Sequence, residues 1–348
     1  MTGTVERTEL VPGRTISRLL KGGWHLAGGH GPIDREQAIH DMAAFVEAGI
    51  TTFDCADHYT GVEELIGEFR ATYPSLAREV QIHTKFVPDY DVLGSVDENY
   101  VRDIIDRSRK RLLVECLDLV QLHWWNPDIP RYIETAQILA RLRKEGKIAE
   151  IGVTNFNVEQ LSRLVDAGIP IVSNQPQYSP IDLRPENGMV DYCREQGIRL
   201  LCYGTLAGGF FSRAWLGQPE PTGPFDNRSL TKYKLIIEDF GGWALLQDLL
   251  HAFDRVAGKH GATIGQVALR WVLDRPGVAG AIVGATSTRH LGEIVGVFAL
   301  RLDDEDRAAI AAVTDRRTGP QGDCYDLERD KTGRHGRIMR YNQNVGRT

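Results

Sequence analysis

The sequence predicts an α/β protein that forms a single (β/α)8 TIM barrel, in which eight parallel strands alternate with helices. Short runs of aliphatic and β-branched residues alternate eight times with segments of helical periodicity. No linker divides the 348 residues. No G-x-G-x-x-G follows the first strand, which argues against a doubly wound sheet.

The eight predicted strands are apolar runs of the kind that a parallel sheet buries on both faces. In order, they are Ile16–Leu20, Ile50–Asp54, Val80–Lys85, Leu117–His123, Ile148–Val153, Ile171–Gln175, Ile198–Tyr203 and Gly280–Val283.

Apolar spacing and capping residues predict the helices between the strands. Asp34 is expected to cap a helix that runs to Ala48, and Ser95 with Glu98 indicates a capping box. The other predicted helices are Val62–Thr72, one spanning Val101–Leu112, Tyr132–Lys144, one entered at Asn157, Glu186–Gln196, Ala244–Ala257, Ile264–Leu273, Arg289–Val295 and Asp303–Val313. A long insert, Gly208–Phe240, follows the seventh strand.

The barrel is expected to occupy residues 1–317, followed by a C-terminal tail over residues 318–348. Polar composition is typical of a disordered end, yet this tail has more apolar residues than a solvated segment needs: Tyr325, Leu327, Ile338, Met339 and Tyr341. We expect part of Asp323–Tyr341 to pack on the barrel near the substrate opening, or on a neighbouring subunit.

Composition predicts a cytoplasmic protein. The net charge of −6 argues against a nucleic-acid partner. Five scattered cysteines without a C-x-x-C pair fit a reducing compartment. No signal peptide opens the chain and no run of about 18 apolar residues predicts a membrane span. The oligomeric state is not predicted.

Four chemically active side chains follow three consecutive strands: Asp54 and Tyr59, Lys85, and His123. Neighbouring strands lie about 4.8 Å apart and their ends share one rim, so these groups converge. Each alone also fits a structural role, such as a helix cap for Asp54, packing for Tyr59, a rim ion pair for Lys85 and stacking on Trp124 and Trp125 for His123. Their convergence favours catalysis.

The stretch Gly49–Gly67 resembles the first signature of the aldo-keto reductases, G-hydrophobic-x-x-F-D-x-A-x-x-Y-G-x-x-E-x-x-x-G. It differs at Thr60, usually glycine, and at Val62, often serine. The resemblance continues in pieces to about Leu300. It implies an NAD(P)H-dependent reductase of small carbonyl compounds, or the reverse alcohol dehydrogenase, with Tyr59, Lys85, His123 and Asp54 as the catalytic residues.

The expected chemistry assigns one role to each residue. Hydride addition to a carbonyl leaves an alkoxide that Tyr59 would protonate. The ammonium of Lys85 would lower the pKa of this phenol, and Asp54 would hold the ammonium charged and aimed. His123 would donate a hydrogen bond to the carbonyl oxygen.

The resemblance implies a cofactor, NADPH or NADP, with NADH or NAD as the alternative. It assigns these residues to cofactor binding: Gly23, Trp24, Thr154, Asn155, Gln175, Tyr203, Gly204, Thr205, Leu206, Gly208, Gly284, Thr286, Ser287, Arg289 and Glu293. The glycines after Tyr203 would approach the pyrophosphate through backbone N–H groups, although a flexible turn also explains them. The segment from Gly284 has glycine where some relatives have lysine, and Ile294 where many have asparagine.

Trp24, Tyr59, His123 and Trp124 are expected to line the substrate pocket, with core packing the alternative for the tryptophans. Asp57 and His58 lack further metal ligands nearby in the sequence, so no metal is expected. Two other functions stay open. Lys85 would serve a Schiff-base aldolase if its pKa were lowered, and the family includes non-catalytic, cofactor-binding regulatory subunits.

Overall fold

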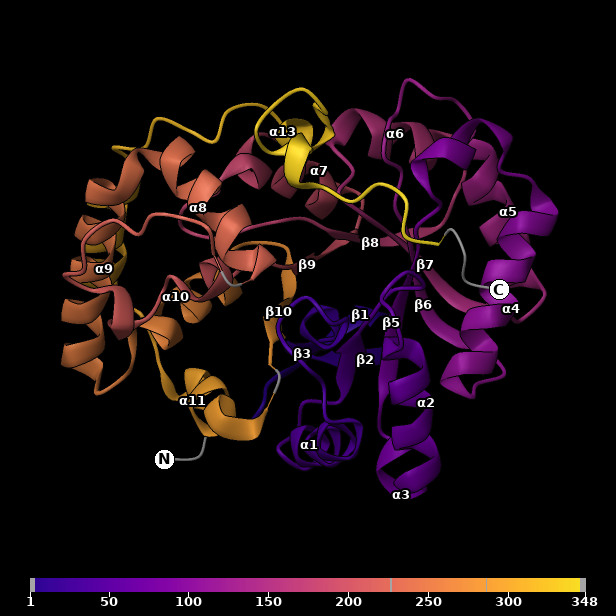
Figure 1. Ribbon diagram of the computed structural model, residues 1–348, viewed down its shortest axis with the longest axis horizontal. Helices are drawn as coiled ribbons and strands as arrows, with labels where there is room; N and C mark the ends of the chain where they lie inside the picture. Colours follow the sequence, from indigo (N-terminus) through magenta and orange to yellow (C-terminus); the bar gives the residue numbers. More distant parts are fainter. Residues whose placement is uncertain (1–3, 226, 286, 345–348) are drawn as a thin grey trace.

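Eight parallel strands close into a barrel in the order β10-β3-β4-β5-β6-β7-β8-β9 (Figure 1). The structure, a computed structural model, describes residues 4–225, 227–285 and 287–344. The closed sheet confirms the predicted (β/α)8 fold. Its strands are β3 (Leu19–Gly22), β4 (Thr52–Asp54), β5 (Gln81–Phe86), β6 (Leu117–Leu122), β7 (Ile148–Thr154), β8 (Ile171–Gln175), β9 (Arg199–Cys202) and β10 (Val278–Gly284).

Helices surround the barrel, and most agree with the predicted segments. They are α1 (Arg35–Glu47), α2 (Val62–Thr72), α3 (Pro74–Ala77), α4 (Glu98–Leu112), α5 (Tyr132–Lys144), α6 (Val158–Asp166), α7 (Met189–Glu195), α8 (Arg228–Phe240), α9 (Gly242–His260), α10 (Ile264–Leu273), α11 (Leu291–Gly296), α12 (Asp304–Thr314) and α13 (Asp326–Arg329). Asp34 caps α1 by accepting from the Gln37 amide at 3.1 Å. The predicted capping box at Ser95 is wrong. Asp97 caps α4, because its side chain accepts from the Tyr100 amide, whereas the Ser95 hydroxyl bonds to Val92 O.

A two-stranded hairpin, β1 (Arg7–Val11) and β2 (Arg14–Ser17), precedes the barrel and corrects the predicted first strand. The run Ile16–Leu20 spans the end of β2 and the start of β3, because the apolar residues on either side of Ser17 read as one strand. Leu10 and Ile16 pack with Leu20 and Leu119. The hairpin therefore closes the amino end of the barrel and leaves the other end for the site.

Alternation along each strand brings the expected catalytic side chains to the inner face. The Ser17 hydroxyl bonds to the side chain of Thr52 at 3.1 Å, so Thr52 faces the barrel interior. Residues two apart share a face, and Asp54 accordingly faces inward as well. Phe53 between them points outward into the main core, where it meets Phe69 of α2. Among the described helices, none combines the length and the apolar character needed to cross a bilayer.

The insert and the tail both lie over the carboxyl end of the barrel. Residues 228–240 of the insert form α8, for which no helix was predicted. The described part of the tail, drawn in yellow in Figure 1, carries α13 and then runs toward α4. The Tyr90 amide donates to Tyr341 O at 2.9 Å, and Asp89 accepts from the amides of Gln343 and Asn344 at 2.7 and 2.9 Å. Residues 345–348 of the predicted tail lie outside the described part.

A buried ion cluster anchors α13 to the barrel. Arg184 donates to both Asp182, at 2.7 Å, and Glu328, at 3.0 Å, and Arg184 and Glu328 are 2% and 1% exposed. Burial alone would raise the pKa of Glu328, but Arg184 and Lys232 lower it to about 2. Buried charges are stable only when they are paired. The Glu328 carboxylate therefore needs its ion pair with Arg184, and this pair ties the tail to the barrel.

Glu328→Gln is expected to lower the free energy of unfolding by about 1.5–3 kcal/mol, the range for a hydrogen bond to a charged group. Because the folded-state pKa lies below the unfolded value, the stabilisation is fully present above about pH 4.5 and is lost as pH falls toward about 2. Urea unfolding of both proteins at pH 7 and pH 3 measures this. If the difference in unfolding free energy between the two proteins does not shrink at pH 3, the prediction is contradicted. Glu305→Gln, at an exposed carboxylate, is the control.

Candidate active site

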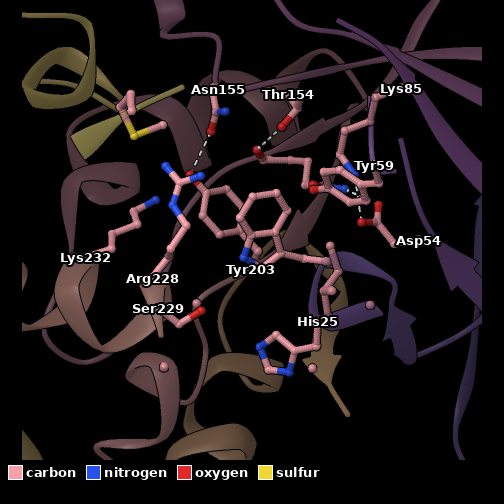
Figure 2. Close-up of a pocket in the computed structure, with 18 of the residues that line it drawn as sticks. His25, Asp54, Tyr59, Lys85, Thr154, Asn155, Tyr203, Arg228, Ser229 and Lys232 are labelled. Atoms are coloured by element: carbon pink, nitrogen blue, oxygen red, sulfur yellow. Dashed lines mark hydrogen bonds and ion pairs between the residues drawn. The ribbon is translucent and has the colours of Figure 1, made fainter. Parts of the chain in front are cut away.

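A cavity of about 430 Å³ opens at the carboxyl ends of the strands (Figure 2). Ligand pockets commonly enclose 300–1,000 Å³. Its lining includes most of the residues singled out from the sequence: Trp24, Asp54, Tyr59, Lys85, His123, Thr154, Asn155, Gln175, Tyr203, Gly204, Thr205, Leu206, Gly208 and Gly284. The structure therefore brings the ends of eight strands to one enclosed space.

Lys85 is bound at the floor of the cavity. Its Nζ lies 2.7 Å from Asp54 Oδ1 and donates to Cys55 O at 2.8 Å, and both side chains are buried. Burial opposes the charged form, but Asp54 and Tyr59 outweigh it and raise the pKa of Lys85 above its usual value. The lysine is an ammonium at neutral pH.

Asp54 is also held by two amides that close the floor around it. Its Oδ2 accepts from Gln175 Nε2 at 2.7 Å and from Gln121 Nε2 at 3.3 Å, and the two glutamines bond to each other at 3.0 Å. Gln121 was not singled out from the sequence, although it lies two residues before His123 on the same inward face of β6. The carboxylate has little freedom to turn away from Lys85.

Tyr59 lies between Lys85 and two aromatic rings. Lys85 Nζ is 5.3 Å from the centre of its ring, and the rings of Trp24 and His58 pack on it with centroids 5.1 and 4.8 Å away. Burial raises the pKa of Tyr59 to about 12, although Lys85 acts in the opposite direction. The expected lowering by the lysine is present but is smaller than the effect of burial, so the phenol is protonated at neutral pH.

His123 is buried and uncharged. Its Nδ1 lies 3.3 Å from Thr154 O, its ring packs edge-on against Trp125 and Tyr325, and burial followed by the charge of Arg329 lowers its pKa to about 3. A carbonyl oxygen only accepts, so the proton of this neutral imidazole sits on Nδ1. Nε2, which has no partner among the described residues, is then an acceptor. The expected donation to a substrate carbonyl would need the other tautomer.

The predicted cofactor residues after β7, β8 and β9 form a hydrogen-bonded set. Thr154 Oγ1 donates to Gln175 O at 3.0 Å, and the Tyr203 hydroxyl donates to Asn155 Oδ1 at 2.8 Å (Figure 2). Asn155 has a positive φ of 64°, a conformation that costs energy outside glycine. Arg329 of the tail donates to Asn155 O at 2.6 Å and thereby holds this strained turn.

Glycines after Tyr203 keep side chains out of one wall of the cavity. A Cβ on Gly204 would lie 2.3 Å from the hydroxyl of Tyr233, and one on Gly208 would lie 2.6 Å from the same ring. Both have positive φ, as does Gly209, which faces open space. A bare backbone beside an aromatic ring and a set of amides fits a nicotinamide dinucleotide, whose phosphates need close N–H groups and whose ring needs a stacking partner.

Several residues assigned to the site lie elsewhere. Gly23 does not line the cavity, and its neighbour Gly22 does. Trp124 is 1% exposed and donates to Ile129 O, so it packs inside its own loop while Trp125 faces the cavity. Glu293 binds Thr263 and His290. Ser287 and Arg289 are exposed outside the cavity, at a 3-10 turn, Thr288–His290, that runs directly into α11. Thr286 lies outside the described residues.

The cavity also has a wall that lies outside the predicted strand ends. It is formed by the insert and the tail and consists of Arg228, Ser229, Thr231, Lys232, Tyr233, Tyr325, Ile338, Met339, Arg340 and Gln343. His25 adds a further ring, which packs over Gly284. No strand-end position marks these residues in the sequence. The apolar residues noted in the tail were the single signal available.

Comparisons with known proteins agree with this geometry. The model of the Aldo/keto reductase family matches residues 18–315. An NADP(+) aldo-keto reductase of Schizosaccharomyces pombe is 31% identical over 297 residues, covering 81% of this chain and 83% of the relative. The NADH-specific methylglyoxal reductase of Escherichia coli is 25% identical over 313 residues, covering 84% and 93%. The solved structure of a glycerol dehydrogenase of Gluconobacter oxydans superposes with a TM-score of 0.76 at 25% identity. The match covers 92% of this chain and 98% of the dehydrogenase chain.

The chain belongs to the aldo-keto reductase family. This aldo-keto reductase is an NAD(P)-dependent oxidoreductase that interconverts small carbonyl compounds and alcohols. The reductase reading fits better than either alternative. A Schiff-base lysine must lose its proton to attack a carbonyl, whereas Asp54 holds Lys85 as an ammonium.

Proposed function

We propose that this enzyme reduces aldehydes or ketones with Tyr59 as the general acid and oxidises alcohols with the same residue as the base. The observation that carries the proposal is the buried Asp54–Lys85 pair directed at the ring of Tyr59. A nicotinamide cofactor supplies or accepts the hydride when it is bound. Residues of this chain orient the reacting oxygen and transfer the proton.

Tyr59 delivers its hydroxyl proton to the oxygen of the reacting carbonyl, where negative charge develops. Lys85 stabilises the phenolate that remains, and Asp54 keeps the ammonium in place. In the tautomer set by Thr154 O, His123 accepts a hydrogen bond at Nε2 and so orients the hydroxyl of an alcohol. Trp24 packs on Tyr59 and Trp125 packs on His123, and both rings line the cavity and limit the entry of water.

The direct test is a panel of aldehydes, ketones and alcohols followed at the NAD(P)H absorbance band with both cofactors. Oxidation of either reduced cofactor that depends on a carbonyl substrate is the expected result. An enzyme that binds cofactor but turns over no carbonyl or alcohol would overturn the proposal and favour the regulatory role.

We propose NADPH as the preferred cofactor. Arg289 is exposed beside Ser287, and together they would meet the 2′-phosphate that distinguishes NADPH from NADH. The relatives differ in this respect, since they include both an NADP(+) aldo-keto reductase and an NADH-specific methylglyoxal reductase. The preference is expected to be moderate, because Gly284 leaves the segment without a second fixed cation.

Arg289→Ala is expected to raise the Michaelis constant for NADPH by about tenfold, which corresponds to the loss of about 1.4 kcal/mol from a charge-assisted contact. The constant for NADH should stay within twofold. Initial rates at saturating carbonyl substrate measure both. Arg255→Ala, at an exposed position of α9, is the control. An equal rise for both cofactors would mean that Arg289 has a structural role.

We further propose that the tail, residues 318–348, works as part of the site. Tyr325 touches His123, and Arg329 holds the turn that carries Asn155. Because Glu328 also neutralises a buried arginine, deleting everything after Arg317 would remove stability together with substrate contacts. Point substitutions in the tail therefore separate these two effects better than truncation does.

A further inference from the structure

The last described residues, 338–344, form a strap across the mouth of the cavity. At one end, Arg228 Nη2 donates to Ile338 O at 2.7 Å, which joins α8 to the strap. At the other end, Asp89 binds the amides of Gln343 and Asn344. Met339 and Arg340 lie between these ties and line the cavity. Both ends are fixed, so Arg340 is held over the opening.

The lining of the cavity carries an excess of positive charge. The described lining contains four cationic side chains, Lys85, Arg228, Lys232 and Arg340, whereas its carboxylate is Asp54, which Lys85 already binds at 2.7 Å. The carboxylate of Glu328 lies 3.9 Å from Lys232 Nζ and offsets the charge of this lysine. Within residues 4–225, 227–285 and 287–344, no carboxylate lies within ion-pair distance of Arg228 or Arg340.

The two arginines also act on each other. Burial, followed by the charge of Arg340, lowers the pKa of Arg228. Two like charges held near one another at the opening of a cavity repel, and an anion between them would remove that repulsion. Arginine is well suited to this task because its planar fork of N–H donors matches carboxylate and phosphate oxygens.

Arg228 is separated from the expected proton donor by one aromatic ring. Its guanidinium lies 6.0 Å from the centre of the Trp24 ring, and the Trp24 ring lies 5.1 Å from that of Tyr59. In Figure 2, Arg228 and Lys232 stand on the side of the cavity opposite Tyr59, Lys85 and Asp54. A molecule whose carbonyl meets Tyr59 would extend toward the arginines.

We propose that the substrates of this enzyme are carbonyl compounds that carry a carboxylate or phosphate group, which Arg228 and Arg340 bind while the carbonyl oxygen faces Tyr59. This inference rests on the proposed function. It adds a substrate class, anionic aldehydes and ketones, and assigns specificity to one residue of the insert and one of the tail.

Three probes with one reacting group test the proposal: 4-carboxybenzaldehyde, 4-formylphenyl phosphate and the neutral methyl 4-formylbenzoate. The wild-type enzyme should show kcat/KM values at least tenfold higher for one or both anions than for the ester, and added salt should narrow the gap because the mouth is open to solvent. The anionic probe with the higher kcat/KM identifies whether carboxylate or phosphate is the preferred group.

Arg340→Gln is expected to lower kcat/KM for the preferred anion by about fivefold to fiftyfold, since it removes one charge-assisted contact. The kcat/KM for the neutral ester should stay within twofold of the wild-type value. Arg340 is exposed, so the substitution should not affect folding. Arg337→Gln removes another exposed tail arginine, one that does not line the cavity, and should change neither kcat/KM value.

Two results would overturn the proposal. One is equal use of the anionic and neutral probes by the wild-type enzyme. The other is an Arg340→Gln enzyme whose dissociation constant for NADPH rises while all three probes lose rate equally, since the guanidinium would then serve a cofactor phosphate. Calorimetric titration with unreactive 4-methylbenzoate separates this inference from the reaction itself, because it detects the anion site even if no carbonyl is turned over.

Discussion

Replacing Tyr59 with phenylalanine is expected to lower kcat for carbonyl reduction by a factor of 10² or more, the usual contribution of a positioned general acid. The ring would remain against Trp24 and His58, so the shape of the cavity is kept and only the proton is lost. Steady-state reduction at saturating cofactor measures the change. The dissociation constant for NADPH, followed by tryptophan fluorescence, should stay within twofold.

Tyr73→Phe is the matched control for this experiment. Tyr73 bonds to His40 on the outer helices and does not line the cavity, so its substitution should leave kcat unchanged. Comparable turnover by Tyr59→Phe and the wild-type enzyme would show that another group supplies the proton and would remove Tyr59 from the proposed mechanism.

Replacing Lys85 with methionine is expected to reduce activity as strongly and to change its pH dependence. Lys85 opposes the rise that burial imposes on the pKa of Tyr59, so without Lys85 this pKa should rise further. The phenolate needed for alcohol oxidation then forms only at higher pH. Oxidation rates measured from pH 7 to pH 11 should show the rising limb displaced to higher pH, and an unmoved limb would contradict the role of Lys85.

The same substitution would leave Asp54 as a buried carboxylate without its cation, which typically costs about 3–5 kcal/mol of stability. A double variant, Asp54→Asn with Lys85→Met, separates this cost from the chemical effect. The neutral amide keeps contact with Gln121 and Gln175, so the double variant should regain much of the stability. It should not regain activity, because Tyr59 still lacks its charged neighbour.

The fold was predictable from the sequence because a parallel barrel repeats one simple pattern. Each strand is a buried apolar run, and each intervening helix has its own apolar spacing or capping residue, as Asp34 shows for α1. The hairpin β1–β2 escaped prediction because Ile16 and Leu19 read as one continuous strand. Ser17 and Arg18 between them gave no turn signal.

The floor of the site was predictable for a related reason. Asp54, Lys85 and His123 end neighbouring strands, and the spacing of a parallel sheet alone brings strand ends together. The wall was not predictable. Arg228 and Arg340 are 112 positions apart and follow no predicted strand, and their approach depends on how α8 and the tail fold over the rim. The pKa of Tyr59 could not be predicted from the sequence either, because burial raises this pKa by more than Lys85 lowers it.

The order of the strands has a consequence for biosynthesis. The sheet closes only when β10 pairs with β3, and the site gains Arg329 and Arg340 only from the last described 16 residues. At about 5–20 residues per second, synthesis leaves the growing chain with an open barrel and an incomplete pocket for most of its time on the ribosome. A chain that stops between Arg317 and Tyr325 would therefore contain every strand of the barrel but lack the part of the pocket wall that the tail supplies.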